Sequence, residues 1–231
     1  MTSNIYILHD CRDFVVCHKP KGVLTLPAET DEASLVDLVR EQLSCEKKTE
    51  LFPVHRLDRT TEGVVVFAKN KKAAAELSAI FSEHKNEKDY LCIVHGEIKE
   101  ENGILTDLLF ADKRANKSYI TDKMRKGVKQ ARLSYKVLST TVYKEKKVSL
   151  LRVSLFTGRM HQIRAQFSHR GHALLGDGKY GSRENSCTTA LFAERIAFSL
   201  YGEKYEFSLP MPDGFPWDLF RGEGEKDSQA L

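Results

Sequence analysis

The chain has 231 residues, of which 41% are hydrophobic, and a formal net charge of +4. This length and composition predict a globular protein with a real core, and no apolar run approaches the roughly 18 residues that a membrane-spanning helix needs. The opening residues, MTSNIYILHDCRD, do not have the basic and then apolar order of a signal peptide, so we expect a cytoplasmic protein.

The first predicted elements are a strand and an amphipathic helix. The sequence DFVVCHKPKGVLTLP (residues 13–27) indicates a strand, a tight turn at residues 19–22 and a second extended piece that ends at Pro27. In TDEASLVDLVREQLS (residues 30–44) the apolar residues recur at helical spacing. We expect a helix there, with Thr30 or Asp31 as its N-terminal cap.

A strand, a helix and another strand follow. GVVVFAKN (residues 63–70) is typical of a short buried strand, and Asn70 can cap the helix KKAAAELSAIFSEHK. YLCIVHGEI (residues 90–98) has the composition of a further core strand.

The remainder of the chain is predicted to be mainly β. We expect strands over residues 131–140 and 148–156 with a polar turn at 144–147, and a hairpin over 196–210 that turns at 202–204. A helix is predicted from about Met160 to His169, ending before Gly171. The sum is an α+β fold: a single domain over residues 1–220 with a largely antiparallel sheet flanked by helices, followed by a polar tail over 221–231.

Metal and nucleotide sites are not indicated. The five cysteines are scattered without a C-x-x-C pair, and the spacing of Cys11, Cys17 and His18 fits no common metal site. Neither G-x-G-x-x-G nor G-x-x-x-x-G-K-S/T occurs, so we expect no nucleotide cofactor and no metal.

Positive charge is concentrated in two segments. Residues 112–132 contain eight Lys or Arg residues against two acids, and residues 151–176 contain no acid at all. The first segment is equally consistent with a solvated face and with polyanion contact. In the second, the bases alternate with apolar residues such as Ile163 and Phe167, so some of them must lie near the core, where an unpaired charge is costly.

A carboxylate stands at the start of the buried strand 63–70. Asp58 follows HRL and precedes RTTEG, and it needs a partner to remain ionised in a poorly solvated place. Arg56 and Arg59 belong to the same extended segment and need not point toward it, so the distant Arg164 is the better candidate. The alternative is that Asp58 and Arg164 form an ordinary structural ion pair, or pair with other residues. Tyr90 begins another buried strand and either lines a cavity or fills the core.

Four segments together resemble the RluA-type pseudouridine synthases: HKPKGVLTLP, HRLD followed by R-x-T-x-G, K-x-Y, and TGR-x-HQIR with GHALLGDGKYG. The resemblance spans about Phe14 to Trp217. It implies an isomerase that converts uridine to pseudouridine in ribosomal or transfer RNA, without metal or cofactor. We expect a monomer, and no separate S4-type RNA-binding domain is evident.

The resemblance also implies roles for individual residues. Asp58 would be the nucleophile, Tyr90 would lie against the target base, and Arg164 would pair with the catalytic carboxylate. Arg56 would contact RNA when the nucleotide leaves its stack. We expect four further basic side chains to contact the substrate: Arg59, Arg159, His161 and Lys179.

Three positions depart from the family pattern. Glu62 stands where serine is usual, His18 replaces a common asparagine, and Ala173 replaces a frequent proline. If Glu62 faced the pocket, it would raise the pKa of Asp58 and repel phosphate. Two other functions remain alternatives to the isomerase. One is an RNA-binding protein without catalysis, and the other is a hydrolase of glycosidic bonds that would use Glu62 as a second carboxylate.

Overall fold

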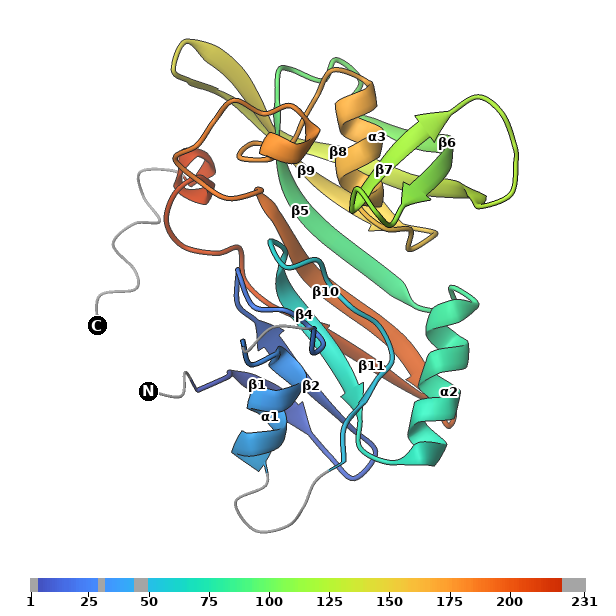
Figure 1. Cartoon of the computed structure of the whole chain (residues 1–231). Coiled ribbons are helices and arrows are strands. Elements are labelled where there is room, and N and C mark those ends of the chain that lie inside the picture. The colour runs from blue at the N-terminus through green and yellow to red at the C-terminus, as the bar shows by residue number, and fades with distance from the viewer. Residues whose placement is uncertain (1–3, 29–31, 44–49, 222–231) are drawn as a thin grey trace, which may run out of the picture. The chain divides into compact units, whose positions relative to one another are not determined.

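The computed structural model describes residues 4–28, 32–43 and 50–221, which form two compact units. The first unit comprises Met1–Asp89 and Ala193–Pro210, and the second comprises Tyr90–Phe192 and Met211–Leu231. The boundary falls within strands β5 (Glu87–His95) and β10 (Leu191–Leu200), so each of these strands contributes residues to both units (Figure 1).

The sheet of the first unit contains the strands predicted around residues 14 and 63. Its order is β1 (Ile7–Asp10), β2 (Phe14–Lys19), β4 (Glu62–Ala68) and β10, with β3 (Phe52–Pro53) paired to β4 and β11 (Glu203–Ser208) paired to β10. The pairs β1–β2, β2–β4, β3–β4 and β10–β11 are all antiparallel.

The β10–β11 hairpin turns earlier than predicted. Its two turn residues are Tyr201 and Gly202, with φ of 53° and 86°, rather than residues 202–204. Two-residue hairpin turns with both φ positive match the right-handed twist of the flanking strands. The sequence signal from Gly202 was therefore correct, but the preceding tyrosine also takes the left-handed conformation.

Two helices belong to the first unit. In α1 (Leu35–Leu43) the predicted caps Thr30 and Asp31 lie outside the described residues, and Ser34 Oγ donates a hydrogen bond to Asp37 Oδ2 at 2.6 Å at the start of the helix. In α2 (Lys71–Ser82) the Asn70 side chain accepts from the Ala73 backbone N–H at 2.9 Å, which confirms the predicted cap. Caps of this kind contribute about 1 kcal/mol of helix stability.

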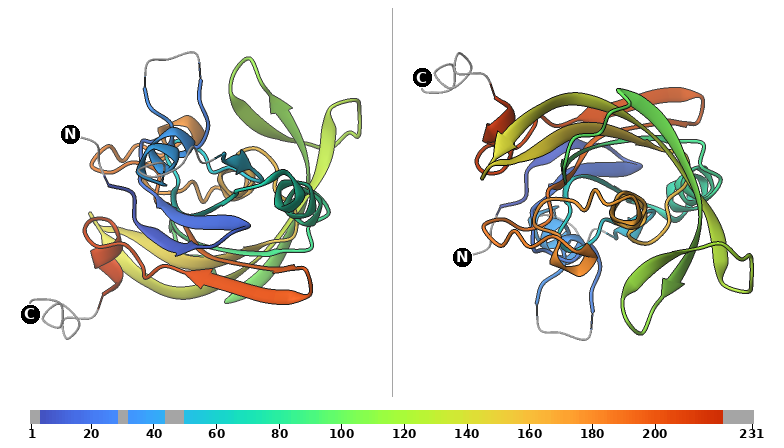
Figure 2. Two further views of the ribbon diagram at one scale, coloured as in Figure 1. Left: turned by 90° about the horizontal axis from the view of Figure 1, so that it is seen from below. Right: turned by 90° about the horizontal axis from the view of Figure 1, so that it is seen from above.

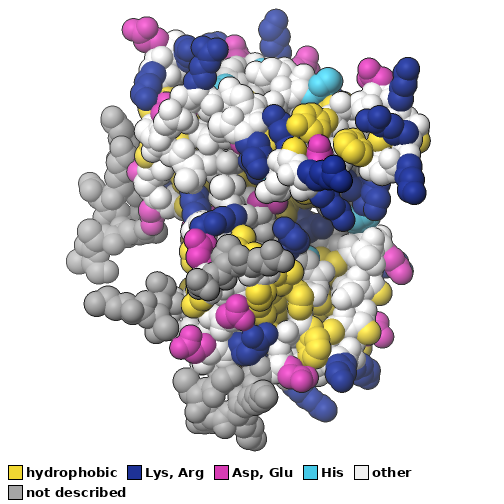
Figure 3. Space-filling model, in the orientation of Figure 1, with side chains coloured by type: hydrophobic (Ala, Val, Ile, Leu, Met, Phe, Trp, Pro, Cys, Tyr) yellow, Lys and Arg dark blue, Asp and Glu magenta, His cyan; other side chains and the backbone are white. Residues whose placement is uncertain are grey.

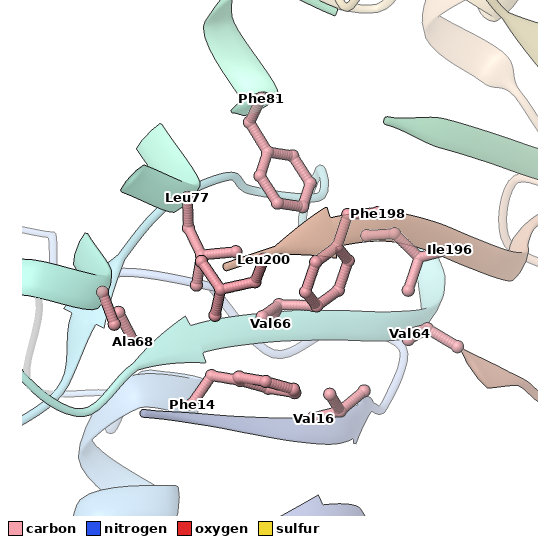
Figure 4. Close-up of a cluster of buried hydrophobic side chains, with 11 residues drawn as sticks. Phe14, Val16, Val64, Val66, Ala68, Leu77, Phe81, Ile196, Phe198 and Leu200 are labelled. Atoms are coloured by element: carbon pink, nitrogen blue, oxygen red, sulfur yellow. The ribbon is translucent and has the colours of Figure 1, made fainter. Parts of the chain in front are cut away.

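The core of the first unit lies between α2 and the sheet (Figure 4). Leu77 and Phe81 of α2 pack over side chains from β2, β4 and β10, and the rings of Phe14 and Phe198 meet edge to face at 5.4 Å. Each such buried side chain stabilises the fold by about 1.5–3 kcal/mol. The buried members of this cluster are Phe14, Val16, Val64, Val66, Ala68, Ala73, Leu77, Phe81, Ile196, Phe198 and Leu200.

The second unit contains a longer meander of strands. Its order is β5, β9 (Lys146–Leu155), β8 (Val128–Tyr143), β6 (Asn102–Asp112) and β7 (Lys117–Thr121), and the pairs β8–β9, β6–β8 and β6–β7 are antiparallel. Strands β6 and β7 were not predicted, because Asp107 interrupts the apolar residues of β6 and β7 is only 5 residues long. Figure 2 shows the green β6–β7 hairpin from two further sides.

Helix α3 (Gln162–His169) packs on this hairpin. It starts two residues later than predicted and ends before Gly171, whose φ of 82° is the left-handed conformation expected just past a helix end. Ala165 of α3 and Tyr180 of the short helix η1 (Gly178–Tyr180) join a buried cluster with Leu109 and Ala131. A second short helix, η2 (Trp217–Phe220), buries Trp217.

The observed elements confirm the predicted α+β class with a largely antiparallel sheet. No helix in the described part of the chain is long and apolar enough to cross a membrane.

Candidate active site

Asp58 lies in the loop between β3 and β4, and the backbone of this loop is held from one side by a threonine. Thr25 Oγ1 donates to Leu57 O at 2.9 Å and accepts from Leu57 N at 3.2 Å, while Thr61 N donates to Asp58 O at 3.0 Å. Leu57 and Thr25 are buried, whereas Asp58 is half-buried. The loop therefore presents a partly accessible carboxylate on a fixed backbone.

A buried lysine holds the same loop from the other side. Lys19 is 0% exposed, and its ammonium donates to the carbonyls of Pro20 at 3.0 Å, Val23 at 2.7 Å and Arg59 at 3.2 Å. Burial lowers the pKa of Lys19 to about 8, although the charges of Asp58 and Glu62 act in the opposite direction. Sequence reasoning placed Lys19 in a turn but missed this role.

The glycine at the start of β4 allows that strand to approach β10. Gly63 has a φ of 132°, and a Cβ atom at this position would lie 2.2 Å from Ala193 O. Since β-carbon contacts below 3.0 Å essentially do not occur, a larger residue would push the two strands apart. The end of the R-T-T-E-G segment is therefore fixed by close backbone packing.

The two arginines beside Asp58 are both exposed but differ in their contacts. Arg59 Nε donates to Gly22 O at 2.9 Å and its Nη2 lies 2.8 Å from a carboxylate oxygen of Glu32, so it ties the loop to the 19–22 turn. Arg56 points to the surface of the first unit. Substrate contact by either residue stays a prediction.

Glu62 is oriented by two neighbours. Its Oε1 lies 3.0 Å from His18 Nε2, and its Oε2 lies 3.7 Å from Lys21 Nζ. Burial opposes its ionisation, but the hydrogen bond with His18 and the charge of Lys21 outweigh this and lower the pKa of Glu62. His18 and Glu62, two of the three departures from the family pattern, thus contact each other. The negative charge of Glu62 is balanced by Lys21.

This pairing predicts a pH dependence of stability. The pKa of Glu62 is below its ordinary value of 4.5, so its ionised form stabilises the fold near neutral pH, and this contribution is lost as the pH falls through the folded-state pKa. Glu62→Gln should lower the thermal midpoint near neutral pH, and the difference from the wild type should shrink in acid. The exposed Glu76→Gln is the matched control, and a difference that stayed constant with pH would contradict the assignment.

The side chain of His55 is bound to the backbone of β4 and packs on the core of the first unit. Its Nε2 accepts from the Val66 backbone N–H at 3.0 Å, and its ring stacks on Phe81 with centroids 4.6 Å apart. Burial, with a smaller contribution from Lys88, lowers the pKa of His55 to about 3.

The ring of His55 should therefore stay neutral far below the ordinary histidine range. In an NMR titration its signals are expected to remain those of neutral imidazole down to about pH 4, because protonation would break the bond to Val66 N. Imidazole added to the sample serves as the titration reference. A His55 midpoint near 6.5 would contradict the burial described above.

In the second unit, a buried ion pair anchors α3. Arg164 Nε donates to Asp177 Oδ2 at 2.7 Å, and Arg164 Nη2 donates to Asp177 Oδ1 at 2.8 Å. The two side chains are 6% and 1% exposed. The paired hydrogen bonds fix the plane of the guanidinium.

Asp177 was missed by sequence reasoning, which expected a carboxylate beside Arg164 but named Asp58. Asp58 belongs to the first unit and Arg164 to the second, and contact between them stays a prediction. The available signal was the GDGKYG segment, where an acid precedes a short turn directly after the acid-free segment.

Tyr180 connects the predicted site residue His161 to β7. The Tyr180 hydroxyl accepts from Ser118 N at 2.7 Å, lies 3.2 Å from Ser118 O and is 3.0 Å from His161 Nδ1. The Arg164 guanidinium carbon lies 5.0 Å from the centre of the Tyr180 ring. His161 itself is buried, with a φ of 51°, at the position that precedes α3.

Arg159 and Lys179, two further residues predicted to contact the substrate, are held by hydrogen bonds to backbone carbonyls. Arg159 Nε donates to Gln130 O at 3.0 Å, and the exposed Lys179 donates to Asn116 O at 2.9 Å. The second unit thus gathers Arg159, His161, Arg164 and Lys179 around the start of α3 and the turn η1. Tyr90 is buried in β5, and Asp58, Arg56 and Arg59 belong to the first unit.

Among residues 4–28, 32–43 and 50–221, no three His, Cys, Asp or Glu side chains are grouped so that they could hold a metal ion.

Comparison with known proteins gives matches over most of the chain. A model of the family described as RNA pseudouridylate synthase matches residues 13–169. The chain is 36% identical to "tRNA pseudouridine synthase C" of Haemophilus ducreyi over 76% of this chain and 73% of that protein. It is 32% identical to an "Uncharacterized RNA pseudouridine synthase" of Aquifex aeolicus over 95% of this chain and 69% of the relative.

A solved structure agrees with these matches. "Human RNA Pseudouridylate Synthase Domain Containing 1" superposes with a TM-score of 0.79 at 26% sequence identity and covers 92% of this chain and 85% of its own.

Proposed function

Because the chain belongs to the RNA pseudouridylate synthase family, whose enzymes are isomerases, we propose that it converts specific uridines in RNA to pseudouridine with Asp58 as the nucleophile. The observation that carries this proposal is the family match over residues 13–169, which includes both the loop of Asp58 and the helix of Arg164.

The proposed reaction rearranges bonds within one nucleotide. The bond between ribose C1′ and uracil N1 breaks, and a bond forms between C1′ and uracil C5. The proton on C5 is lost and N1 gains one, so atoms and electrons balance without an external oxidant or reductant. An ionised carboxylate can act as the nucleophile in such a sequence because it forms a covalent intermediate that divides one difficult step into two.

The geometry of the Asp58 loop supports a nucleophilic role. A nucleophile must be accessible yet held in a fixed orientation, and Asp58 is half-buried in a loop whose backbone is bound by Thr25 and Lys19. The Lys19 ammonium binds the backbone carbonyl of Arg59, the residue next to Asp58, at 3.2 Å.

Residues of the second unit are proposed to complete the site. Arg164, whose orientation is set by Asp177, would hold the catalytic carboxylate, and Tyr90 would lie against the target base. Arg56 would occupy the space that the nucleotide leaves when it is turned out of its stack, a step that this chemistry requires. Arg59, Arg159, His161 and Lys179 would contact the RNA near the reacting nucleotide.

Transfer RNA is the substrate that we propose first, with ribosomal RNA as the alternative. The support is that relatives at 36% and 33% identity carry the name tRNA pseudouridine synthase C. A glycosidic hydrolase would need a second carboxylate beside Asp58. Glu62 is a poor candidate for that role, since it forms ion pairs with His18 and Lys21.

Release of tritium from RNA that carries the label at uridine C5 tests the proposal. Transfer RNA and ribosomal RNA pools are incubated separately with the wild type and with Asp58→Ala. Release from either pool by the wild type, and from neither by the variant, is the expected result. Wild-type protein that released no tritium from any cellular RNA pool would overturn the proposal, and appearance of free uracil would indicate a hydrolase.

A further inference from the structure

Strands β6, β7 and β8 have one covered face and one exposed face. Leu109 and Ala131 face α3, where they pack with Ala165 and Tyr180, and Ile120 joins them. Because successive side chains on a strand point to opposite faces, the residues next to them in sequence lie on the other side of the sheet.

That other side carries aromatic rings. Phe110 and Tyr119 are directly opposite each other in the β6–β7 register, and Tyr119 is 44% exposed. Phe156, just beyond the end of β9, is 43% exposed. A single exposed aromatic residue is ordinary, but several on one face of a sheet form a patch that is typical of a binding surface.

Cationic groups lie against these rings. The guanidinium carbon of Arg125 is 5.1 Å from the centre of the Phe110 ring, and that of Arg132 is 4.8 Å from the centre of the Phe156 ring. Lys117 Nζ is 5.6 Å from the centre of the Tyr119 ring. We call Phe110, Tyr119, Phe156, Arg125 and Arg132 the aromatic face.

The positive charge around the aromatic face is not neutralised by the protein. The eight bases of residues 112–132 form no salt bridge with a carboxylate of the described residues, in contrast to Arg170 and Arg195, which bind Asp107 and Asp89. Figure 3 shows hydrophobic and basic side chains side by side at the upper right, where Figure 1 labels β6 and β7. An anionic partner is therefore expected on this surface.

Planar rings, arginines and uncompensated positive charge together match one kind of partner. Proteins bind single-stranded nucleic acid by stacking bases on aromatic rings while cations follow the phosphates. A duplex conceals its bases from such rings and offers backbone charge alone.

We propose that the aromatic face binds an unpaired segment of the RNA substrate, with bases stacked on Tyr119 and Phe156 and phosphates held by Arg125, Arg132 and the neighbouring lysines. The proposal rests on the proposed function for the identity of the RNA. It adds a second contact region, which selects RNA that has an unpaired segment at a suitable distance from the target uridine.

Binding of a fluorescein-labelled oligoadenylate of about 12 nucleotides, within the roughly 4–16-nucleotide site sizes of single-strand binding folds, tests the proposal by fluorescence anisotropy. Oligoadenylate contains no uridine that the enzyme could convert, so the measurement does not depend on catalysis. Tyr119→Ala and Phe156→Ala are each expected to raise Kd by about fivefold or more, which corresponds to the lower end of base stacking. Arg125→Gln should reduce the slope of log Kd against log salt by about one.

Tyr201→Ala is the matched control. Tyr201 is 49% exposed and has Lys72 Nζ 4.9 Å from its ring centre, but it lies in the β10–β11 turn, outside the basic segment. This variant should bind oligoadenylate like the wild type. Circular dichroism melting of all variants confirms that each is folded.

Two results would overturn the inference: equal Kd values for Tyr119→Ala, Phe156→Ala and Tyr201→Ala, or competition by duplex RNA as strong as by single strands. Either result is distinct from failure of the proposed function, which is absence of tritium release by the wild type.

Discussion

Replacement of Asp58 by asparagine is expected to lower the rate of pseudouridine formation by about 10⁴-fold or more, the range seen when a nucleophile is removed from an enzyme. The amide has nearly the same shape, and the loop is held through backbone contacts to Thr25 and Lys19, so the fold should persist. RNA affinity should be unchanged or slightly higher, because a negative charge is removed from a surface that binds a polyanion. Single-turnover tritium release measures the rate.

The control for this variant is Asp10→Asn, which neutralises another carboxylate of the same unit, one that binds Lys69 at the surface. That variant should keep its activity. An Asp58→Asn enzyme within tenfold of the wild type, after deamidation has been excluded by mass spectrometry, would show that Asp58 is not the nucleophile.

Among the substitutions proposed, Arg164→Met is expected to lower the free energy of unfolding most. It removes both hydrogen bonds from a carboxylate that is 1% exposed and leaves the Asp177 charge buried without its partner. Breaking a buried ion pair from one side typically costs about 3–5 kcal/mol of unfolding free energy. Chemical denaturation measures this loss, and tritium release should be lost to a greater extent than RNA binding.

The double variant Arg164→Met/Asp177→Asn separates the two roles of the arginine. Neutralising the orphaned acid should recover part of the lost stability, since no buried charge remains, but it should restore no turnover. A double variant that regained activity would mean that Arg164 acts on catalysis merely through the fold. Equal losses of binding and turnover in Arg164→Met would instead assign the arginine to the RNA backbone.

The sequence was most informative where local rules decide the structure. The cap at Asn70, the end of α3 before Gly171 and the strand that follows Asp58 depend on neighbours within a few residues. Strand β6 does not, because its Asp107 is bound by Gln166 and Arg170, which lie 59 and 63 residues later in the chain. A single sequence does not contain that long-range information.

The candidate site shows the same division. Asp58 and Arg164 could be singled out because a charge beside an apolar run requires a partner, yet the sequence did not give Asp177 as that partner for Arg164. The contact of Glu62 with His18 arises from the antiparallel pairing of β2 with β4, which places Lys19 opposite Gly63. Once this register is known, the two unusual residues are neighbours.

Each unit is built from two segments that are separated in the chain, and this has a consequence during protein synthesis. The core of the first unit needs Phe198 and Leu200, about 100 residues after Asp89 in the chain. At about 5–20 residues per second, the ribosome takes roughly 5–20 seconds to make the intervening part. Throughout this interval the emerging chain exposes Phe14 and Val66 without their partners from β10. We therefore expect nascent chains stalled before residue 193 to bind chaperones, and chains released beyond residue 210 to escape them.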